Sequence, residues 1–318
     1  MSDTGPLGER VMRRLKLREL RILTVVAQTG SMGKAAAQLA LSQPAVSKAI
    51  AEMENTLGVA LLDRTSQGVE PTLYGRALLK WTVAVFDDLR QGVREIEFLA
   101  DPRAGNVRVG SHEIMNAGLL PAVIGRLSRQ HPRLVFSITQ APTTAAQYHD
   151  LRERRVDLVF GRMMGPMGGE DLNAKILFDD PLIVVAGRGS KWLRRRNIDP
   201  AELINEPWCL PRPESGIAPF VAQAFRALGL GMPRQIVSAN SAHLFYAMVR
   251  TGSFLSVAPA STLRFSGKCL GLKAVPVDIP IQPGPIGIIT LKNRTISPVA
   301  QLFIDCASEL AKPLANKK

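Results

Sequence analysis

The stretch that decides the fold covers residues 41–48 and reads Leu41-Ser42-Gln43-Pro44-Ala45-Val46-Ser47-Lys48. Ser42 is a favoured N-cap residue, and Pro44 falls in the first turn of the helix that follows, where its missing N–H costs no hydrogen bond. The apolar residues of this helix recur at spacings of three and four and therefore share one face: Val46, Ala49, Ile50, Met53 and Leu57. Gly58 predicts the end of the helix.

The sequence before this stretch predicts two further helices. The first carries apolar residues at helical spacing from Leu17 to Ala27, and Gly30 predicts its end. Ser31 is a favoured N-cap for the second helix, which contains alanine at positions 35–37. Because alanine side chains let two helices approach closely, we expect a compact three-helix head.

One face of the third helix is small and polar, since Gln43, Ser47 and Lys48 lie off the apolar stripe. Glutamine can pair with adenine through two hydrogen bonds, serine can donate or accept, and lysine can donate to guanine or phosphate. Free N–H groups at the helix N-terminus also favour a nearby phosphate. This face would suit the major groove of DNA, but an ordinary three-helix packing module with a solvated face fits the periodicity equally well.

A short hairpin is expected after the head. Residues 61–65 and 69–72 flank the polar turn Ser66-Gln67-Gly68, which is typical of two antiparallel strands joined by a tight connection. Arg64 would then be placed to reach a phosphate or the minor groove. The alternative is a surface hairpin in which Arg64 is solvated or paired with Asp63.

A long helix is predicted from Thr72, its N-cap, to about Ala100. Its apolar positions alternate at spacings of three and four over three heptads and read Leu79, Thr82, Phe86, Leu89, Val93, Ile96 and Ala100. Such a seam favours pairing of two helices from two chains, although a helix that folds back on its own domain is the alternative. A symmetric dimer would present two recognition helices about one DNA turn apart, or a multiple of it, which suits an inverted repeat.

Strands and helices alternate after a break at residues 101–106. Strands are expected at 107–110, 134–139, 157–160, 182–186, around 236, at 254–258 and at 286–291. Helices are expected between them at 119–130, 145–154, 217–228 and 242–250, and a closing helix at 298–311. This order predicts two α/β units with mainly parallel sheets, the closing helix belonging to the first, and a ligand cleft between them at the carboxyl ends of the strands.

Polar residues follow these strands and begin these helices. The candidates for binding a small molecule are Ser111, His112, Thr143, Thr144, Arg162, Ser215, Asn240 and Ser241. Hydroxyls and free N–H groups at helix starts suit an anion, so a small carboxylate is the expected ligand. Several of these residues could equally be N-caps, His112 could pack in neutral form, and Arg162 could pair with a carboxylate of the domain. Glu214 would oppose an anion.

Composition separates several classes of protein. The 318 residues carry a formal net charge of +13, but residues 1–100 hold 13 Lys and Arg against 11 Asp and Glu, whereas residues 101–318 hold 27 against 16. Total charge therefore gives no argument for DNA binding by the head. The four histidines lack metal-ligand spacing, and no Gly-x-Ser-x-Gly, phosphate-binding loop or dinucleotide fingerprint is present. We expect that the protein is not an enzyme and that it binds no cofactor and no metal.

The cysteines and the apolar runs bear on the compartment. Cys209, Cys269 and Cys306 are widely spaced, so three reduced thiols are expected rather than a disulfide framework or zinc site. No window approaches the ~18 uninterrupted apolar residues of a membrane helix. The first ten residues include Asp3 and Glu9 and have no apolar core, so no secretory signal is expected. The expected location is the cytoplasm, without membrane contact.

Taken in order, these motifs resemble the winged helix-turn-helix of LysR-type transcriptional regulators. The resemblance rests on Leu17-Arg18-Glu19-Leu20-Arg21, Gly30-Ser31, Ala35-Ala36, residues 41–47, Leu57-Gly58-Val59 and Leu62-Asp63-Arg64-Thr65. It implies that Ser42, Gln43, Pro44, Ser47 and Lys48 face bases and nearby backbone, and that Ser31, Arg64 and Thr65 contact phosphates. Lys48 stands where the family often has Arg, and lysine lacks the planar fork that pairs with guanine.

The resemblance also covers the rest of the chain. It implies a winged helix-turn-helix domain at 1–72, a dimerising linker helix at 73–100 and an effector-binding domain at 101–318, similar to periplasmic solute-binding proteins. Lobe I would span about 107–162 and 267–318, and lobe II about 163–266. The expected partners are double-stranded DNA with an inverted repeat, a small-molecule effector, further copies of the chain in a homodimer and homotetramer, and RNA polymerase. The alternative is a cytoplasmic α/β binding protein or enzyme with a fused helical interaction head.

Overall fold

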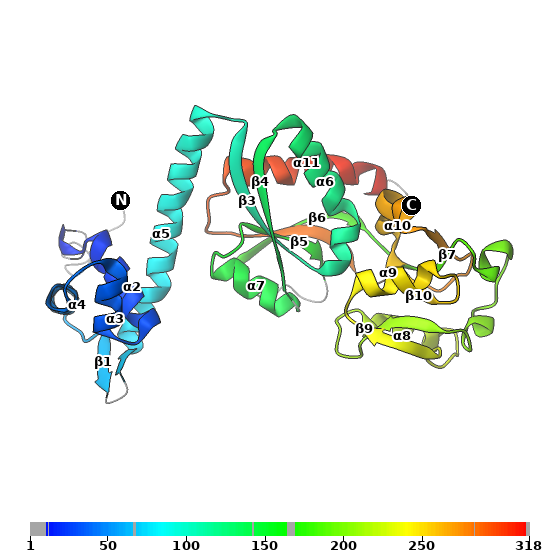
Figure 1. Ribbon diagram of the computed structural model, residues 1–318, viewed down its shortest axis with the longest axis horizontal. Coiled ribbons are helices and arrows are strands. Elements are labelled where there is room, and N and C mark those ends of the chain that lie inside the picture. The colour runs from blue at the N-terminus through cyan, green and yellow to red at the C-terminus, as the bar shows by residue number, and fades with distance from the viewer. Residues whose placement is uncertain are drawn as a thin grey trace. The chain divides into compact units, whose positions relative to one another are not determined.

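The computed structural model describes residues 11, 13–65, 68–141, 143–163, 169–282 and 284–315 (Figure 1). The chain divides into two compact units, residues 1–90 and 91–318. The predicted multidomain α/β fold is confirmed, with a helical N-terminal unit and a C-terminal unit built on two five-stranded sheets.

The first unit is a three-helix head with a hairpin. Its elements are α2 (Leu17–Thr29), α3 (Met32–Leu39), α4 (Gln43–Leu57), β1 (Leu62–Thr65), β2 (Gly68–Pro71) and the first part of α5 (Leu73–Ala100). Ser31 caps α3 by accepting from the Lys34 N–H, and Ser42 caps α4 by accepting from the Ala45 N–H. Gly58 ends α4 with a left-handed φ of 76°. The serine caps and the glycine end of α4 are those that the sequence predicts.

The head has one apolar core, and the hairpin is fastened to it. Val26, Val46 and Met53 are fully buried at its centre. The Val69 N–H donates to the Gly30 carbonyl at 2.9 Å, which joins β2 to the turn after α2. A Cβ on Gly75 would lie 2.0 Å from the Leu61 carbonyl oxygen, so only glycine lets the first turn of α5 lie against the backbone before β1.

Lobe I of the second unit is built on a sheet with the strand order β4-β3-β5-β12-β6. The strands are β3 (Ala104–Ser111), β4 (Arg133–Gln140), β5 (Leu158–Arg162), β6 (Leu172–Asp179) and β12 (Pro285–Leu291). The helices are η1 (Glu113–Ala117), α6 (Leu119–Gln130), α7 (Thr144–Arg152) and α11 (Pro298–Ala315). The strand β3 is parallel to both β4 and β5, while β12 is antiparallel to β5 and β6.

Lobe II is built on a second sheet with the order β11-β7-β10-β8-β9. The strands are β7 (Leu182–Gly187), β8 (Trp208–Pro211), β9 (Gln235–Ala239), β10 (Leu255–Pro259) and β11 (Leu272–Ala274). The helices are η2 (Lys191–Arg194), η3 (Pro200–Leu203), α8 (Ala218–Ala227), α9 (Ala242–Arg250) and α10 (Ala260–Leu270). Its core centres on Trp208 and Phe225, whose rings meet edge to face at 5.8 Å.

The chain crosses from one sheet to the other at different positions from those that the sequence predicts. The predicted lobe II began at about residue 163, but β6 pairs with β12 and so extends the sheet of lobe I to Asp179. The predicted return to lobe I at about 267 is also displaced, because α10 and β11 precede it and β11 pairs with β7. The chain crosses between lobes at residues 180–181 and again between Ile281 and Pro285. Both β6 and β11 are edge strands that the sequence does not predict, and both boundaries shift with them.

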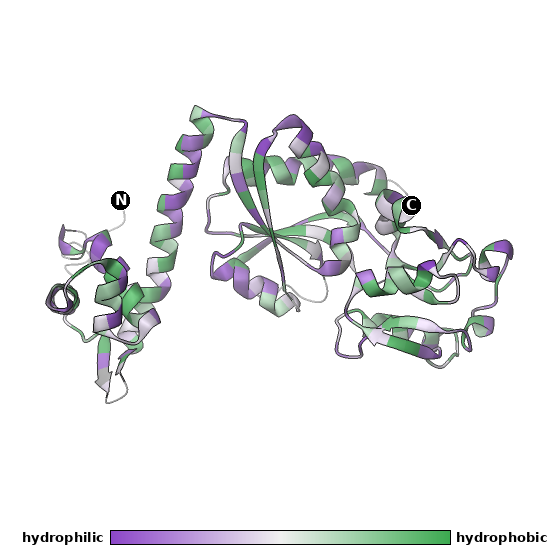
Figure 2. Ribbon diagram, in the orientation of Figure 1, coloured by the Kyte–Doolittle hydropathy of each residue, from purple (hydrophilic) through white to green (hydrophobic). Residues whose placement is uncertain are grey.

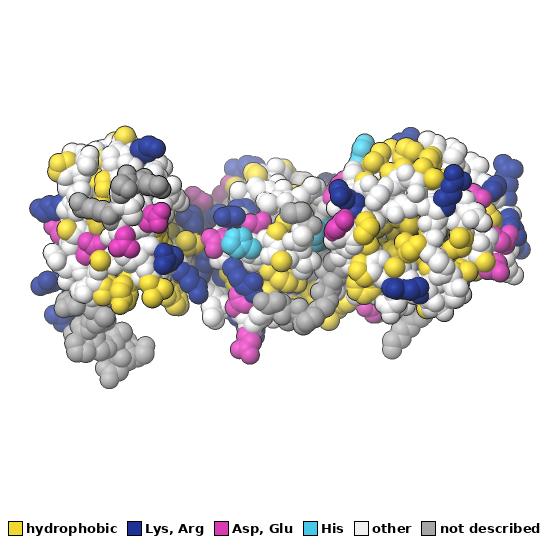
Figure 3. All heavy atoms as spheres, turned by 90° about the horizontal axis from the view of Figure 1, so that it is seen from below, with side chains coloured by type: hydrophobic (Ala, Val, Ile, Leu, Met, Phe, Trp, Pro, Cys, Tyr) yellow, Lys and Arg dark blue, Asp and Glu magenta, His cyan; other side chains and the backbone are white. Residues whose placement is uncertain are grey.

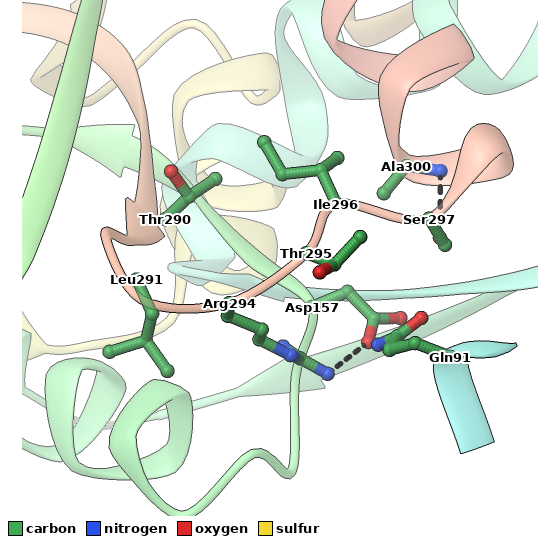
Figure 4. A pocket seen from close by; sticks show the side chains of 9 residues that line it. All are labelled: Gln91, Asp157, Thr290, Leu291, Arg294, Thr295, Ile296, Ser297 and Ala300. Carbon is green, nitrogen blue, oxygen red and sulfur yellow. Dashed lines mark hydrogen bonds and ion pairs between the residues drawn. The ribbon is translucent and has the colours of Figure 1, made fainter. Parts of the chain in front are cut away.

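A buried carboxylate, that of Asp157, gathers three arginines at the end of α5 nearest lobe I. Arg108 of β3 donates to it through its backbone N–H at 2.8 Å and its guanidinium at 2.5 Å. Arg294, itself 7 % exposed, donates at 2.7 Å, and Arg94 of α5 lies at 3.4 Å. Figure 4 shows Arg294 and Asp157 beside Gln91, which belongs to α5 as Arg94 does.

The protonation equilibrium of Asp157 reflects this cluster. Burial raises the pKa of its carboxyl, but the hydrogen bonds from Arg108 and the charges of Arg108 and Arg294 outweigh burial and hold the pKa below its ordinary value of 3.8. A group whose pKa is lower in the folded state stabilises that state above its unfolded pKa, and the effect disappears as pH falls through the folded pKa. The ionised carboxylate therefore stabilises lobe I at neutral pH.

We expect Asp157→Ala to lower the free energy of unfolding of the second unit by about 3–5 kcal/mol, because it leaves buried and half-buried arginines without their counter-charge. Urea denaturation followed by circular dichroism measures this loss. The difference from wild type should be constant between about pH 5 and pH 8 and shrink below about pH 4. Glu309→Ala, which breaks the exposed pair with Arg126, is the control and should cost less than about 1 kcal/mol. Equal losses in both variants would contradict a structural role for the cluster.

Candidate functional site

The N-terminal half of α4 presents a polar face to solvent. Ser42, Gln43, Pro44 and Lys48 are exposed, and Ser47 is half-buried. The Lys48 ammonium lies 3.9 Å from the Glu52 carboxylate, with 79 % of its side chain exposed. On the opposite face of the helix the apolar stripe is buried in the head. The structure therefore places all five predicted base-facing residues at one end of one helix.

The predicted phosphate contacts lie on neighbouring segments of the head. Ser31 begins α3, and Thr65 ends β1, where its hydroxyl donates to the Gly68 carbonyl at 3.3 Å. A Cβ on Gly33 would lie 3.6 Å from Gln43 Oε1 and 3.9 Å from Ser31 Oγ, so the starts of α3 and α4 are close together. The backbone of Arg64 belongs to β1, whereas its side chain and residues 66–67 lie outside the described residues.

The predicted dimerisation seam of α5 divides into a covered and an exposed half. Leu79 packs against the core of the head, Thr82 is 2 % exposed and Phe86 is half-buried. Leu89, Val93 and Ile96 are 47, 54 and 68 % exposed. The exposed stripe also includes Trp81 and Val85, which the heptad spacing did not select. The alternation of apolar and polar residues along α5 is visible as green and purple bands in Figure 2.

In lobe I, the candidate effector residues lie at adjacent strand ends. Ser111 pairs with Gln140 of β4 and with Phe160 of β5, so residues 111–112, 141, 143–144 and 162 lie at the same edge of the sheet. Ser111 is fully buried and its hydroxyl donates to the His112 carbonyl at 3.3 Å. The cap of α7 is Thr143, which accepts from the Ala146 N–H, while Thr144 is half-buried.

His112 carries a nitrogen without a visible partner. Burial lowers the pKa of its imidazole, and a hydrogen bond with the Ala141 backbone opposes this effect only in part. The ring is therefore neutral near pH 7 and can donate at one nitrogen and accept at the other. Its Nε2 is buried and has no hydrogen-bond partner in the described part of the chain. The same holds for Oδ1 of Asn116 in η1.

Arg162 is an anchor of the crossing segments. It is 6 % exposed, and its Nη1 donates to the Asp180 and Gly284 carbonyls at 2.6 Å each. Its Nη2 lies 3.6 Å from the Asp180 carboxylate. Arg162 thus pairs with a carboxylate of its own domain, which is the alternative that the sequence left open. Its guanidinium is engaged within the chain rather than available to bind an effector directly.

In lobe II, the candidates follow two neighbouring parallel strands. Pro211 of β8 pairs with Ala239 of β9, so Ser215 and residues 240–241 leave the same edge of this sheet. Ser215 accepts from the Ala218 N–H, Asn240 is exposed, and Ser241 caps α9 by accepting from the Leu244 N–H. Glu214 is exposed and lies 3.4 Å from Arg212, so its charge has a nearby partner.

Glu113 of η1 connects the two sets of candidates. Its Oε1 accepts from the Ser241 hydroxyl and from the His243 N–H, both at 3.3 Å. Sequence reasoning missed this residue, because no motif marks a glutamate that reaches a helix 128 residues further along the chain.

Other kinds of site receive no support from the described residues. Within residues 11, 13–65, 68–141, 143–163, 169–282 and 284–315, no group of three or more His, Cys, Asp or Glu side chains is placed to hold a metal ion. In the same part of the chain, no helix is both long and apolar enough to cross a membrane. The three cysteines are free, with Cys209 and Cys306 buried and Cys269 exposed.

Several solved structures share the architecture of the whole chain. The crystal structure of full-length CbnR in complex with its target DNA is 20 % identical, with a TM-score of 0.60 over 93 % of this chain and 99 % of that one. Full-length OxyR C199D from Pseudomonas aeruginosa is 22 % identical, with a TM-score of 0.63 over 96 % and 99 %. At these identities the likeness shows the fold.

Sequence comparisons show the family. Residues 17–76 match the bacterial regulatory helix-turn-helix of the lysR family, and residues 100–312 match the LysR substrate-binding domain. The transcriptional regulator GbpR of Azospirillum brasilense is 29 % identical over 91 % of this chain and 84 % of its own length. The regulator YdcI of Escherichia coli K12 is 30 % identical over 92 % and 95 %. The chain therefore belongs to the LysR family of DNA-binding transcriptional regulators, which carry an effector-binding domain and are not enzymes.

Proposed function

We propose that the chain reads the two halves of an inverted repeat through paired α4 helices, and that an organic acid bound to the second unit modulates this binding. The observation that carries the DNA proposal is the exposed cluster of Gln43, Ser47 and Lys48 at the start of α4, opposite a buried apolar stripe. A helix with this geometry can place its first turns against base edges. Net charge adds little, since Lys and Arg are interspersed with Asp and Glu on the face drawn in Figure 3.

We expect Gln43→Ala and Ser47→Ala to reduce discrimination between a promoter fragment and random DNA by about 10- to 100-fold, because each base pair read directly contributes about 1–3 kcal/mol. Fluorescence anisotropy at several salt concentrations measures both affinities. Asn55→Ala, an exposed change at the far end of α4, should leave the discrimination unchanged. An equal loss of affinity for both DNAs in the Gln43 and Ser47 variants would contradict base reading by these residues.

The exposed half of α5 is the proposed dimer contact. Members of the family act as oligomers, and a stripe of large apolar side chains open to solvent is stabilised when a second copy covers it. The residues are Trp81, Val85, Leu89, Val93 and Ile96, each at least 38 % exposed. In the covered half, Leu79 packs against the core of the head, Thr82 is buried and Phe86 is half-buried.

Leu89→Glu combined with Val93→Glu should lower the molar mass of the chain in light scattering, because two buried charges per helix would oppose the pairing. Phe86 is a poorer target, since it is half-buried within its own chain. Lys80→Glu introduces a glutamate about two and a half turns before Leu89, on the opposite side of α5, and is the control. An unchanged mass for the double variant, at the mass of the control, would rule out the seam.

The effector is proposed to be an organic acid held between the strand ends of both lobes. Hydroxyls and free N–H groups are collected there at the starts of α7, α8 and α9, and such groups favour an anion. Ser111, His112, Thr143 and Thr144 would contribute from lobe I, and Ser215, Asn240 and Ser241 from lobe II. The excess of Lys and Arg in residues 101–318 also favours a negatively charged ligand. Arg162 would act only indirectly, through the crossing segments.

A thermal-shift screen of organic acids on the wild-type chain should yield at least one acid that raises the melting temperature. Thr144→Val keeps the shape of the side chain and removes its hydroxyl, so it should lose that rise. Ser128→Ala, an exposed change on α6, should retain it. A screen in which no carboxylate raises the melting temperature would reject the effector class, and an unaltered response of Thr144→Val would place the site elsewhere.

A further inference from the structure

The contact of Glu113 joins the two lobes at the start of α9. Glu113 lies in η1 of lobe I, whereas Ser241 and His243 belong to lobe II. One carboxylate oxygen accepts from the Ser241 hydroxyl and the His243 N–H at 3.3 Å each. Both donors belong to the first turn of α9 and its cap. The carboxylate therefore occupies the place where the N-terminus of a helix favours an anion.

Two buried hydroxyls beside this contact make no hydrogen bond of normal geometry among the described residues. Tyr246 is 4 % exposed and Thr262 is fully buried, yet neither hydroxyl has a hydrogen-bond partner of normal geometry among the described residues. The negative charge of Glu113 acts on the Tyr246 hydroxyl, so this hydroxyl lies near the contact between Glu113 and α9. Burial and the negative charges of Glu113 and Asp180 raise the pKa of Tyr246 to about 12, and a weak interaction with the Thr262 hydroxyl opposes them only in part. Because buried polar groups are normally hydrogen-bonded, these hydroxyls indicate a missing partner.

The neighbouring helix closes the same region. A Cβ on Gly118, at the end of η1, would lie 3.2 Å from Ser261 Oγ and 3.6 Å from Thr262 Oγ1. The start of α10 therefore packs directly on the segment that carries Glu113. A group that replaced the Glu113 carboxylate would meet the donors of α9 and could reach the two unpaired hydroxyls.

We propose that the Glu113 carboxylate is an internal stand-in for the acid group of the effector, which binds at the N-terminus of α9 by displacing it. This proposal rests on the proposed organic-acid effector and names the donors that recognise its carboxylate: Ser241 Oγ, the His243 N–H and the Tyr246 hydroxyl. Displacement releases η1 from α9 and so removes a bond between the lobes. The effector thus replaces the contact of Glu113 with the start of α9 by its own contact with the same donors.

The test uses the full-length chain with sodium acetate as the probe and sodium chloride at equal ionic strength as the reference. In Glu113→Ala the site is open, so acetate should raise the melting temperature with half-saturation at a concentration about tenfold or more below that of wild type. Adding Ser241→Ala removes a donor and should abolish this gain. Glu113→Gln retains an oxygen that can accept from both donors without a charge, which preserves the fold, and its response should fall between those of wild type and Glu113→Ala.

Glu214→Ala is the matched control, because it removes an exposed carboxylate of lobe II that lies 3.4 Å from Arg212. Its acetate response should equal that of wild type. An acetate response in both Glu113 variants that is no stronger than in wild type overturns the proposal. If an organic acid stabilises the wild-type chain while both variants ignore acetate, only the role of Glu113 is refuted. If no organic acid stabilises the wild-type chain, the effector class itself is refuted.

Discussion

The relation between the two lobes depends on a buried pair, Arg162 and Asp180, where the chain crosses from one sheet to the other. Arg162 donates to the carbonyls of Asp180 and Gly284, one on each crossing segment, and the Asp180 carboxylate accepts from the Ser261 N–H and hydroxyl at 2.9 and 2.7 Å. Burial raises the pKa of Asp180 and lowers that of Arg162, while the attraction between them opposes both shifts. Removing either partner would leave an uncompensated buried charge, so this pair fixes where the lobes are joined.

Two further carboxylates make contacts that matter for function, one with the linker helix and one between the lobes. Asp157 binds Arg94 of α5 together with Arg108 and Arg294 of lobe I, so the last turns of the linker helix are held by the same domain that is proposed to sense the ligand. Glu113 bridges from lobe I to the start of α9 in lobe II. A ligand that breaks the contact between Glu113 and α9 changes lobe I, and the sheet of lobe I also carries the contact between Asp157 and Arg94 of α5. This gives a physical route from an effector to the helix that is proposed to pair two DNA-reading heads.

The sequence predicted the head closely because its signals are local. The serine caps of α3 and α4, the glycine that ends α4 and the apolar stripe each act within a few residues, and the structure shows all of them. The strand ends of the second unit were also predictable from alternation. Long-range features were not: the pairing of β6 with β12, the Glu113 contact and the role of Arg162 depend on residues far apart in the chain. The sequence left open whether the α5 seam pairs with a second copy or folds back on its own domain, and spacing alone does not show that the head packs on Leu79.

As proposed, the site-specific complex of this chain with DNA responds to an organic acid. A DNase I footprint of the full-length protein on the intergenic DNA beside its gene tests this most directly, with and without the acid that most raises its melting temperature. We expect protection of an inverted repeat with half-sites one helical turn or a multiple of it apart, and a pattern of protection that changes when the acid is added. Protection spread over all sequences, or a footprint that the acid leaves unchanged, would contradict it.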